Sequence, residues 1–226
     1  LLNELGGPWK VRFQPGLGAP ESIVLEELSS LSENADPGVK YFSGTATYEA
    51  QLELSGERPV DARIVLDLGE VKNIAEAIVD GRSQILWKPP FEADLTAAFA
   101  KADSVRGRIK VTNLWPNRLI GDDFKPEDCE WKGARGGIKE IPQWVKEGKP
   151  SPTGQKTFTT WKHWSKEDKL LPSGILGPVR LELARTVSGP LTLKMHADEN
   201  WWGLGAGWGR DMPFTFESNF TADLRT

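Results

Sequence analysis

The chain has 226 residues, of which 38% are hydrophobic, and its formal net charge at pH 7 is −4. This length suits one large β domain or a domain with an appendage. The charge gives no basic footprint for a nucleic-acid partner, and no apolar run approaches the roughly 20 residues that cross a bilayer. The first residues lack the regions of a signal peptide, and no Met precedes them. We therefore expect a mature or excised piece of a longer protein, with neither nucleic acid nor membrane as a partner.

Short segments of alternating apolar and polar residues recur along the chain and predict β-strands. They span residues 9–13, 45–54, 62–68, 74–79, 83–87, 108–113, 177–183 and 191–196. Glycine, proline and aspartate occur in nearly every gap between them. This spacing predicts an all-β fold, an antiparallel β-sandwich or jelly roll with long irregular loops and few short helices.

Turn and helix signals lie between these strands. Asp80-Gly81 predicts a tight hairpin turn, since this pair is the strongest short-range hairpin signal. Start and stop signals predict about two helical turns within residues 22–31. A second short helix is predicted at 94–100, with its first residue, an aspartate, as the cap.

Two stretches lack the regular strand pattern. Residues 122–173 show no clear periodicity, and a loop of that length is generally functional or packed on something. The composition changes near residue 186, and residues 201–209 are rich in Trp and Gly. We expect residues 1–186 to form one jelly roll. Residues 187–226 would form a C-terminal β extension with a Trp/Gly loop that completes the sandwich, because two strands alone are marginal in water.

Polar residues gather where one predicted strand ends. Pro116 cannot donate to a β ladder, and Asn117, Arg118 and Asp122 follow it among large apolar residues. Arg118 offers donors in a fork that matches a carboxylate, and Asp122 is the near candidate. We predict that these three residues and Asn113 form a buried or half-buried polar corner rather than an active site. A sugar site is the alternative.

Tryptophan is unusually frequent, with ten residues against two tyrosines. Trp9 and Trp87 lie in strand patterns and are expected in the core. Loop tryptophans can stack on the apolar face of a sugar ring while nearby polar groups bond its hydroxyls. The candidate sugar-binding residues are Trp115, Asn117, Arg118, Trp131, Trp144, Trp201, Trp202 and Trp208. In the competing interpretation, loop tryptophans pack the long loop onto the sandwich or onto another domain.

An acidic cluster follows the polar corner at Asp122, Asp123, Glu127 and Asp128. Calcium takes six to eight oxygen ligands, so these carboxylates are candidates for a structural Ca²⁺ site. The alternative is a solvated acidic loop in which Asp122 pairs with Arg118. Two histidines and one cysteine are too scattered for a zinc site, and no phosphate-binding motif occurs. We assign no catalytic residue.

Five segments carry a resemblance to a known family. They read KYFSGTATY (40–48), LWKPPF (86–91), NLWPNRLIGD (113–122), IPQW (141–144) and PSGILGPV (172–179). They are similar to the C-terminal region of glycoside hydrolase family 106, the α-L-rhamnosidases. The order of strands between residues 48 and 111 also resembles the galactose-binding-like jelly roll with which family 2 glycosidases bind sugar. Asp80 replaces the expected asparagine, and residues 187–226 match nothing in that region.

The resemblance implies an ancillary role. The catalytic carboxylates and the calcium of family 106 belong to an N-terminal (β/α)8 barrel that this sequence lacks, so no catalytic residue carries over. We expect a carbohydrate-associated module of a bacterial glycoside hydrolase, periplasmic or secreted, that buttresses this catalytic domain and contacts glycan. One alternative is a carbohydrate-binding module that holds plant-type polysaccharide in its own right. Another is a free-standing enzyme.

Overall fold

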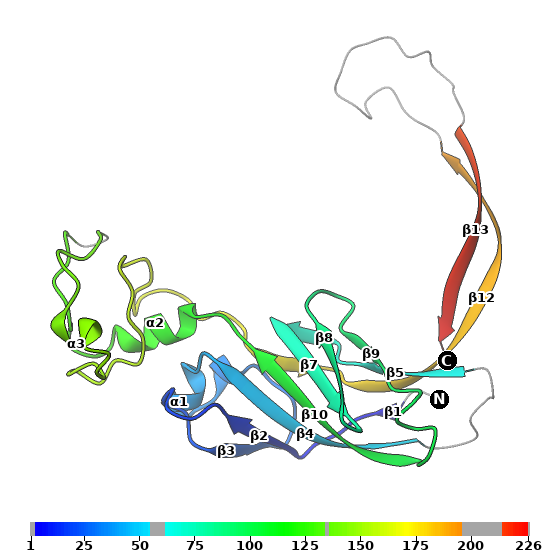
Figure 1. The fold of residues 1–226 in the computed structure, drawn as a ribbon, viewed down its shortest axis with the longest axis horizontal. Helices are drawn as coiled ribbons and strands as arrows, with labels where there is room; N and C mark the ends of the chain where they lie inside the picture. Colours follow the sequence, from blue (N-terminus) through cyan, green and yellow to red (C-terminus); the bar gives the residue numbers. More distant parts are fainter. Residues whose placement is uncertain (1–2, 55–61, 134–135, 196–213, 226) are drawn as a thin grey trace, which may run out of the picture.

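The computed structural model describes residues 3–54, 62–133, 136–195 and 214–225. Its two main sheets are antiparallel throughout, as shown in Figure 1. One sheet has the strand order β3 (Ser22–Leu25), β2 (Trp9–Phe13), β4 (Thr45–Glu53), β10 (Ser104–Thr112), β7 (Ile74–Val79) and β8 (Arg82–Leu86). The other has the order β1 (Asn3–Glu4), β12 (Arg180–Met195), β5 (Ala62–Asp67) and β9 (Glu92–Asp94), with β13 (Phe214–Arg225) paired to β12. A small sheet pairs β6 (Glu70–Lys72) with β11 (Gly174–Gly177).

The core lies between the two main sheets. Tyr48 of β4 and Ile109 of β10 are buried on one side, and Ile64 of β5 and Leu181 of β12 are buried in the same apolar cluster. Alternate residues of β2 point inward, since Trp9, Val11 and Phe13 are buried while the residues between them are exposed, which is what the period of two in the sequence requires. The predicted all-β antiparallel sandwich is therefore confirmed.

Helices are short in the described part of the chain. They are the 3-10 helix Leu31–Glu33, α1 (Pro37–Lys40), α2 (Pro116–Asp122) and α3 (Gln143–Lys146). No helix among the described residues is long and apolar enough to cross a membrane. The hairpin prediction is confirmed, since Asp80 and Gly81 join β7 to β8 with φ values of 49° and 72°. A type I′ turn requires a positive φ at both of its central residues, as found here.

Three local predictions were wrong. Residues 22–25 form strand β3 instead of a helix, because they pair with β2 at the edge of the sheet. Residues 96–100 form turns: the Asp94 carboxylate does accept a bond from the Thr96 N–H at 2.9 Å, but no regular helix follows. Trp87 is 68% exposed rather than buried. It follows β8, an edge strand that buries none of its own residues.

Strand β12 runs without interruption across the boundary predicted at residue 186. It pairs with β5 through Arg180–Arg185 and with β13 through Ala184–Met195. Figure 1 shows the β12–β13 hairpin running away from the sandwich. Division of the chain at residue 186 stays a prediction. The candidate sugar residues Trp201, Trp202 and Trp208 lie outside the described residues.

Candidate functional site

The predicted polar corner lies at the end of the sandwich that is farther from the β12–β13 hairpin (Figure 1). β10 ends at Thr112, and α2 begins four residues later at Pro116. A proline suits the first turn of a helix, because the N–H that it lacks would have no partner there. The helix carries Asn117, Arg118 and Asp122 on buried positions.

Asn113 fastens the chain between β10 and α2 to the neighbouring loop. Its amide nitrogen donates to the carbonyl of Phe42 at 2.8 Å, and its carbonyl oxygen accepts from the N–H of Gly44 at 2.9 Å. The hydroxyl of Ser43 donates to the carbonyl of Leu114 at 2.8 Å. Asn113 is 7% exposed, so both polar ends of this side chain are used inside the protein.

Asn117 performs the same task for the end of the long loop. Its amide nitrogen donates to the carbonyl of Leu171 at 2.7 Å, and its carbonyl oxygen accepts from the N–H of Leu171 at 2.8 Å. Asn117 is 2% exposed. This side chain was a candidate for sugar binding, and here it is engaged by the backbone.

Arg118 and Asp122 form the buried ion pair that was predicted. A terminal nitrogen of Arg118 lies 3.3 Å from a carboxylate oxygen of Asp122, and both side chains are almost fully buried. The guanidinium carbon lies 5.9 Å from the ring centre of Tyr41. Burial lowers the pKa of Arg118, while the charge of Asp122 opposes that shift. The buried polar corner is therefore confirmed.

Asp122 also anchors the loop that follows α2. Its second carboxylate oxygen accepts three hydrogen bonds, from the N–H of Lys156 at 2.8 Å and from the N–H and hydroxyl of Thr157, both at 2.9 Å. Its first oxygen also pairs with Lys125 at 3.3 Å. A carboxylate with this many donors is strongly committed to the fold.

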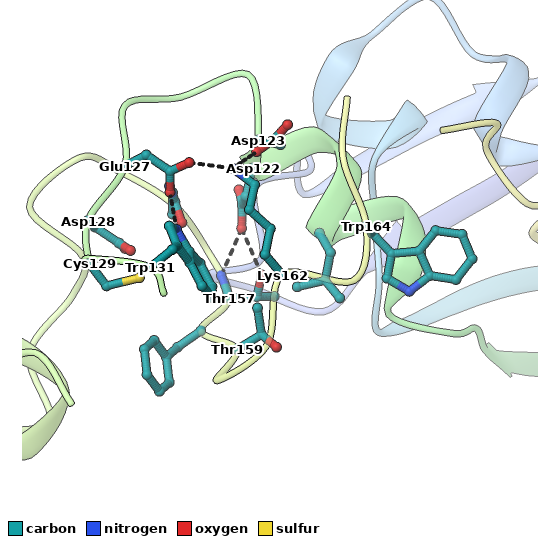
Figure 2. A pocket seen from close by; sticks show the side chains of 13 residues that line it. Asp122, Asp123, Glu127, Asp128, Cys129, Trp131, Thr157, Thr159, Lys162 and Trp164 are labelled. Atoms are coloured by element: carbon teal, nitrogen blue, oxygen red, sulfur yellow. Dashed lines mark hydrogen bonds and ion pairs between the residues drawn. The ribbon is translucent and has the colours of Figure 1, made fainter. Parts of the chain in front are cut away.

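The remaining carboxylates of the acidic cluster have protein partners as well. Lys162 contacts Asp123 at 3.0 Å and also bonds to Glu127, as Figure 2 shows. Burial lowers the pKa of Lys162, but these two carboxylates outweigh burial and raise it. Asp128 accepts from the hydroxyl of Ser151 at 2.7 Å. The described residues contain no group of three or more His, Cys, Asp and Glu side chains that could hold a metal ion, so the calcium prediction gains no support.

A narrow hollow of about 40 Å³ lies among these residues, lined by the acidic cluster and by Thr157, Thr159 and Lys162 of the loop opposite (Figure 2). It has room for a few water molecules and is far smaller than the roughly 300–1,000 Å³ of usual ligand pockets. Cys129 lines it. Burial and the charges of Asp128 and Glu127 raise the pKa of this thiol to about 11. A thiol with such a pKa is a poor nucleophile at neutral pH.

The loop tryptophans divide into two kinds. Trp131 donates its indole N–H to Glu127 at 2.7 Å, and Trp144 donates its own to the carbonyl of Asp128 at 3.2 Å. These two rings hold the loop together. Trp115 and Trp161 are instead 60% and 57% exposed, so their rings are free to meet a partner.

Sequence reasoning missed a second hollow. It has a volume of about 190 Å³ and is lined by Lys72, Asn73, Leu114, Asn117, Leu171, Pro172 and Ser173. Asn73 and Ser173 were not among the candidates, because they are 100 positions apart in the chain. Nothing in the local sequence of either residue shows that the two line one pocket. The only hint was the position of Ser173 in the segment 172–179, one of the five that resemble family 106.

Comparisons with known proteins find that the chain is similar to parts of larger glycoside hydrolases. No family model matches it. It is 43% identical over 181 residues to a protein from Formosa agariphila assigned as a β-glucuronidase, covering 79% of this chain and 15% of that protein. A solved rhamnosidase from Novosphingobium sp. PP1Y matches with a TM-score of 0.62 and 36% identity, over 79% of this chain and 14% of the rhamnosidase.

More distant structures share the fold alone. The β-glucuronidase of Ruminococcus gnavus matches with a TM-score of 0.52 and 14% identity, over 99% of this chain and 33% of that enzyme. The relatives named here are thus glycoside hydrolases, and the chain spans only about a seventh of the two most similar ones.

Proposed function

We propose that this chain is an ancillary β-sandwich module of a bacterial glycoside hydrolase of the α-L-rhamnosidase kind, which buttresses a catalytic (β/α)8 domain in the same protein. The observation that carries the proposal is the 36% identity with a rhamnosidase over 79% of this chain but only 14% of that enzyme. Similarity that covers most of one chain and only a small part of the other is what a shared accessory domain produces. The relative from Formosa agariphila points to glucuronides instead, so the sugar is the first thing to test.

The chemistry of the polar corner supports an ancillary role. Asn117, Arg118 and Asp122 are bound to the backbone, to each other and to the long loop. Side chains so engaged are poorly placed to act on a substrate. They serve instead to hold residues 123–171 in one arrangement on the end of the sandwich.

The exposed apolar residues of this end support a contact with another domain. Four apolar residues between the end of β10 and the start of β11 are each at least half exposed: Leu114, Trp115, Phe124 and Trp161. A contiguous patch of exposed apolar side chains is typical of a surface that meets a partner. Under this proposal the partner is the catalytic domain of the same protein.

Activity measurements on the natural gene product test the proposal. We expect the whole protein to hydrolyse an aryl α-L-rhamnoside, and we expect the isolated 226-residue chain to hydrolyse neither that substrate nor an aryl β-D-glucuronide. Comparable kcat/KM values for the isolated chain and the whole protein would refute the ancillary role. If the whole protein hydrolyses only the glucuronide, the ancillary role of this chain stands, and the parent enzyme is a glucuronidase instead of a rhamnosidase. Fractionation of the source cells tests the periplasmic or secreted location that the proposal carries.

The buttressing contact can be tested in the same protein. Trp115→Ala should lower the melting temperature of the catalytic domain if the indole packs against it. Trp87→Ala is the matched control, since Trp87 is 68% exposed but lies beyond the edge strand β8. Equal effects of the two substitutions would contradict a specific contact at the α2 end.

A carbohydrate-binding module is the second candidate, and the exposed rings of Trp115 and Trp161 favour it. Such rings can stack on sugars without help from another domain. Affinity electrophoresis of the isolated chain in gels that contain rhamnogalacturonan distinguishes the two candidates. Retardation that Trp115→Ala or Trp161→Ala abolishes would establish direct polysaccharide binding.

A further inference from the structure

We infer that the β12–β13 hairpin is a dimerisation surface, which packs face to face against the same hairpin of a second copy of this chain. The part concerned is residues 187–195 of β12 with their partners 214–222 of β13, here called the ribbon. Figure 1 shows the ribbon running away from the sandwich, at the end opposite to α2.

The register of the two strands decides which residues share a face of the ribbon. Leu193 is opposite Phe216, and the next pair along is Thr192 opposite Glu217. Residues that are directly opposite in an antiparallel pair lie on the same face, and successive residues of one strand lie on opposite faces. Leu193 and Phe216 are therefore on one face, and Thr192 and Glu217 are on the other.

The two faces of the ribbon differ sharply in composition. On the face of Leu193, every β12 residue is apolar or glycine, and Ser218 is the one polar residue that β13 adds. The other face consists of serine, proline, threonine, lysine, glutamate and asparagine. The six largest residues of the apolar face are Leu191, Leu193, Met195, Phe214, Phe216 and Phe220.

The apolar face of the ribbon continues the core face of the sandwich. Leu181 and Leu183 of β12 are opposite Leu66 and Ile64 of β5, and all four belong to the apolar core or pack against it. Because alternate residues of a strand share a face, the odd-numbered residues 187–195 extend this face beyond the sandwich. At the usual rise per residue the ribbon adds about 27 Å of apolar face.

Such a face needs a cover. β12 pairs with β5 only as far as Arg185, and beyond it β13 is the one described strand that pairs with β12. Two strands alone are marginal in water, and a contiguous apolar patch marks a surface that meets a partner. Pro190 in the middle of β12 has no N–H, which makes this edge a poor template for a further strand. The cover therefore packs on the face of the ribbon instead of pairing with its edge.

A second copy of the chain fits this face. No charged residue lies on it, so the partner must itself be apolar, and the same face of another copy meets that requirement about a twofold axis. Its three phenylalanines can bury roughly 150–250 Å² each, and the aliphatic residues bring the total near the roughly 800 Å² per partner of a standard interface. The proposed function assigns the catalytic domain to the α2 end, which leaves the ribbon for another partner; this step alone rests on that proposal.

Sedimentation equilibrium of the 226-residue chain tests the inference. We expect a monomer–dimer equilibrium with a Kd in the micromolar range or tighter, as for an interface of standard size. A chain that is still monomeric at about 200 µM would overturn the dimer.

Variants locate the interface on one face of the ribbon. Leu193→Lys places two unpaired charges in the dimer and should weaken it by at least about 100-fold. Thr192→Lys is the matched control, since it puts the same side chain one residue away on the polar face and should change the Kd by less than about twofold. Leu193→Thr keeps the strand propensity and should weaken the dimer by about tenfold.

Folding is checked on dilute, monomeric samples, in which the melting temperature of the sandwich should be the same for all three variants. An unchanged Kd in Leu193→Lys and Leu193→Thr, or equal weakening by Thr192→Lys, would overturn the assignment of the face. Light scattering of the natural gene product completes the test. If that protein is monomeric while the 226-residue chain dimerises, another part of the same protein covers the ribbon, and a second copy is excluded. Hydrolysis is measured separately, so failure of the proposed function leaves these results unaffected.

Discussion

Asn117 and Leu171 are 54 positions apart in the chain, yet the side-chain amide of Asn117 is bonded to both the N–H and the carbonyl of Leu171. This pair closes the long irregular segment onto α2 in the way that a β bridge would close a hairpin. The side-chain amide of Asn117 thus takes the place of a backbone hydrogen-bonding partner for a loop that has almost no regular structure of its own.

Removal of that amide should destabilise the protein. Asn117→Ala leaves the N–H and the carbonyl of Leu171 without partners in a largely buried place, and each loss costs roughly 1–3 kcal/mol. We expect the free energy of unfolding in urea to fall by about 2–4 kcal/mol. Ser83→Ala, which removes an exposed bond to Glu76, should cost less than about 0.5 kcal/mol. Similar losses in the two variants would mean that the Asn117 bonds contribute little.

Within the polar corner, Asp122 should matter more than Arg118. Arg118→Ala removes one partner of Asp122, which keeps Lys125, Lys156 and Thr157. Asp122→Ala removes all of these bonds and leaves a buried guanidinium unpaired. Breaking a buried pair costs roughly 3–5 kcal/mol, so we expect Arg118→Ala near the lower end and Asp122→Ala near the upper end.

Urea unfolding of both single variants and of the double variant checks this order. The double variant should be less destabilised than the sum of the two, because the partners interact directly. A larger loss for Arg118→Ala than for Asp122→Ala would show that the guanidinium, rather than the loop bonds of the carboxylate, holds the corner.

The sandwich and the polar corner could be predicted because their signals are local. Strand alternation and the Asp80-Gly81 turn need only neighbouring residues, and Arg118 and Asp122 are one helical turn apart. The exposure of Trp87 could not be read in this way, because it depends on β8 being an edge strand. The pocket of Asn73 and Ser173 depends on the pairing of β6 with β11, which brings distant segments together.

Cys129 should react slowly with alkylating reagents. Its pKa is raised from the ordinary 9.0 to about 11, so the thiolate fraction at pH 8 falls by about 100-fold. The rate of reaction with iodoacetamide should rise about tenfold per pH unit from pH 8 and level off only near pH 11. In urea the same chain should level off near pH 9. A folded protein that levels off near pH 9 would contradict the influence of burial and of Asp128 and Glu127 on the thiol.

Gly174 should tolerate no side chain. It has a φ of +93°, and a Cβ at this position would lie 2.4 Å from the hydroxyl oxygen of Tyr48. Tyr48 is fully buried and cannot move away. Left-handed backbone costs a residue with a Cβ roughly 1–2 kcal/mol, and overpacking adds roughly 1–3 kcal/mol, so Gly174→Ala should cost about 3–4 kcal/mol.

Gly81→Ala is the matched control, because Gly81 has a φ of +72° but no heavy atom within 4 Å of the added Cβ. It should cost only the backbone part, roughly 1–2 kcal/mol. Tyr48→Phe removes the obstructing oxygen together with the bond that it accepts from the N–H of Ile175. In the Gly174→Ala background, Tyr48→Phe should therefore be close to neutral or stabilising, although alone it should cost about 1 kcal/mol. Strict additivity of the two substitutions in urea unfolding would show that the Tyr48 hydroxyl is not what excludes a side chain at residue 174.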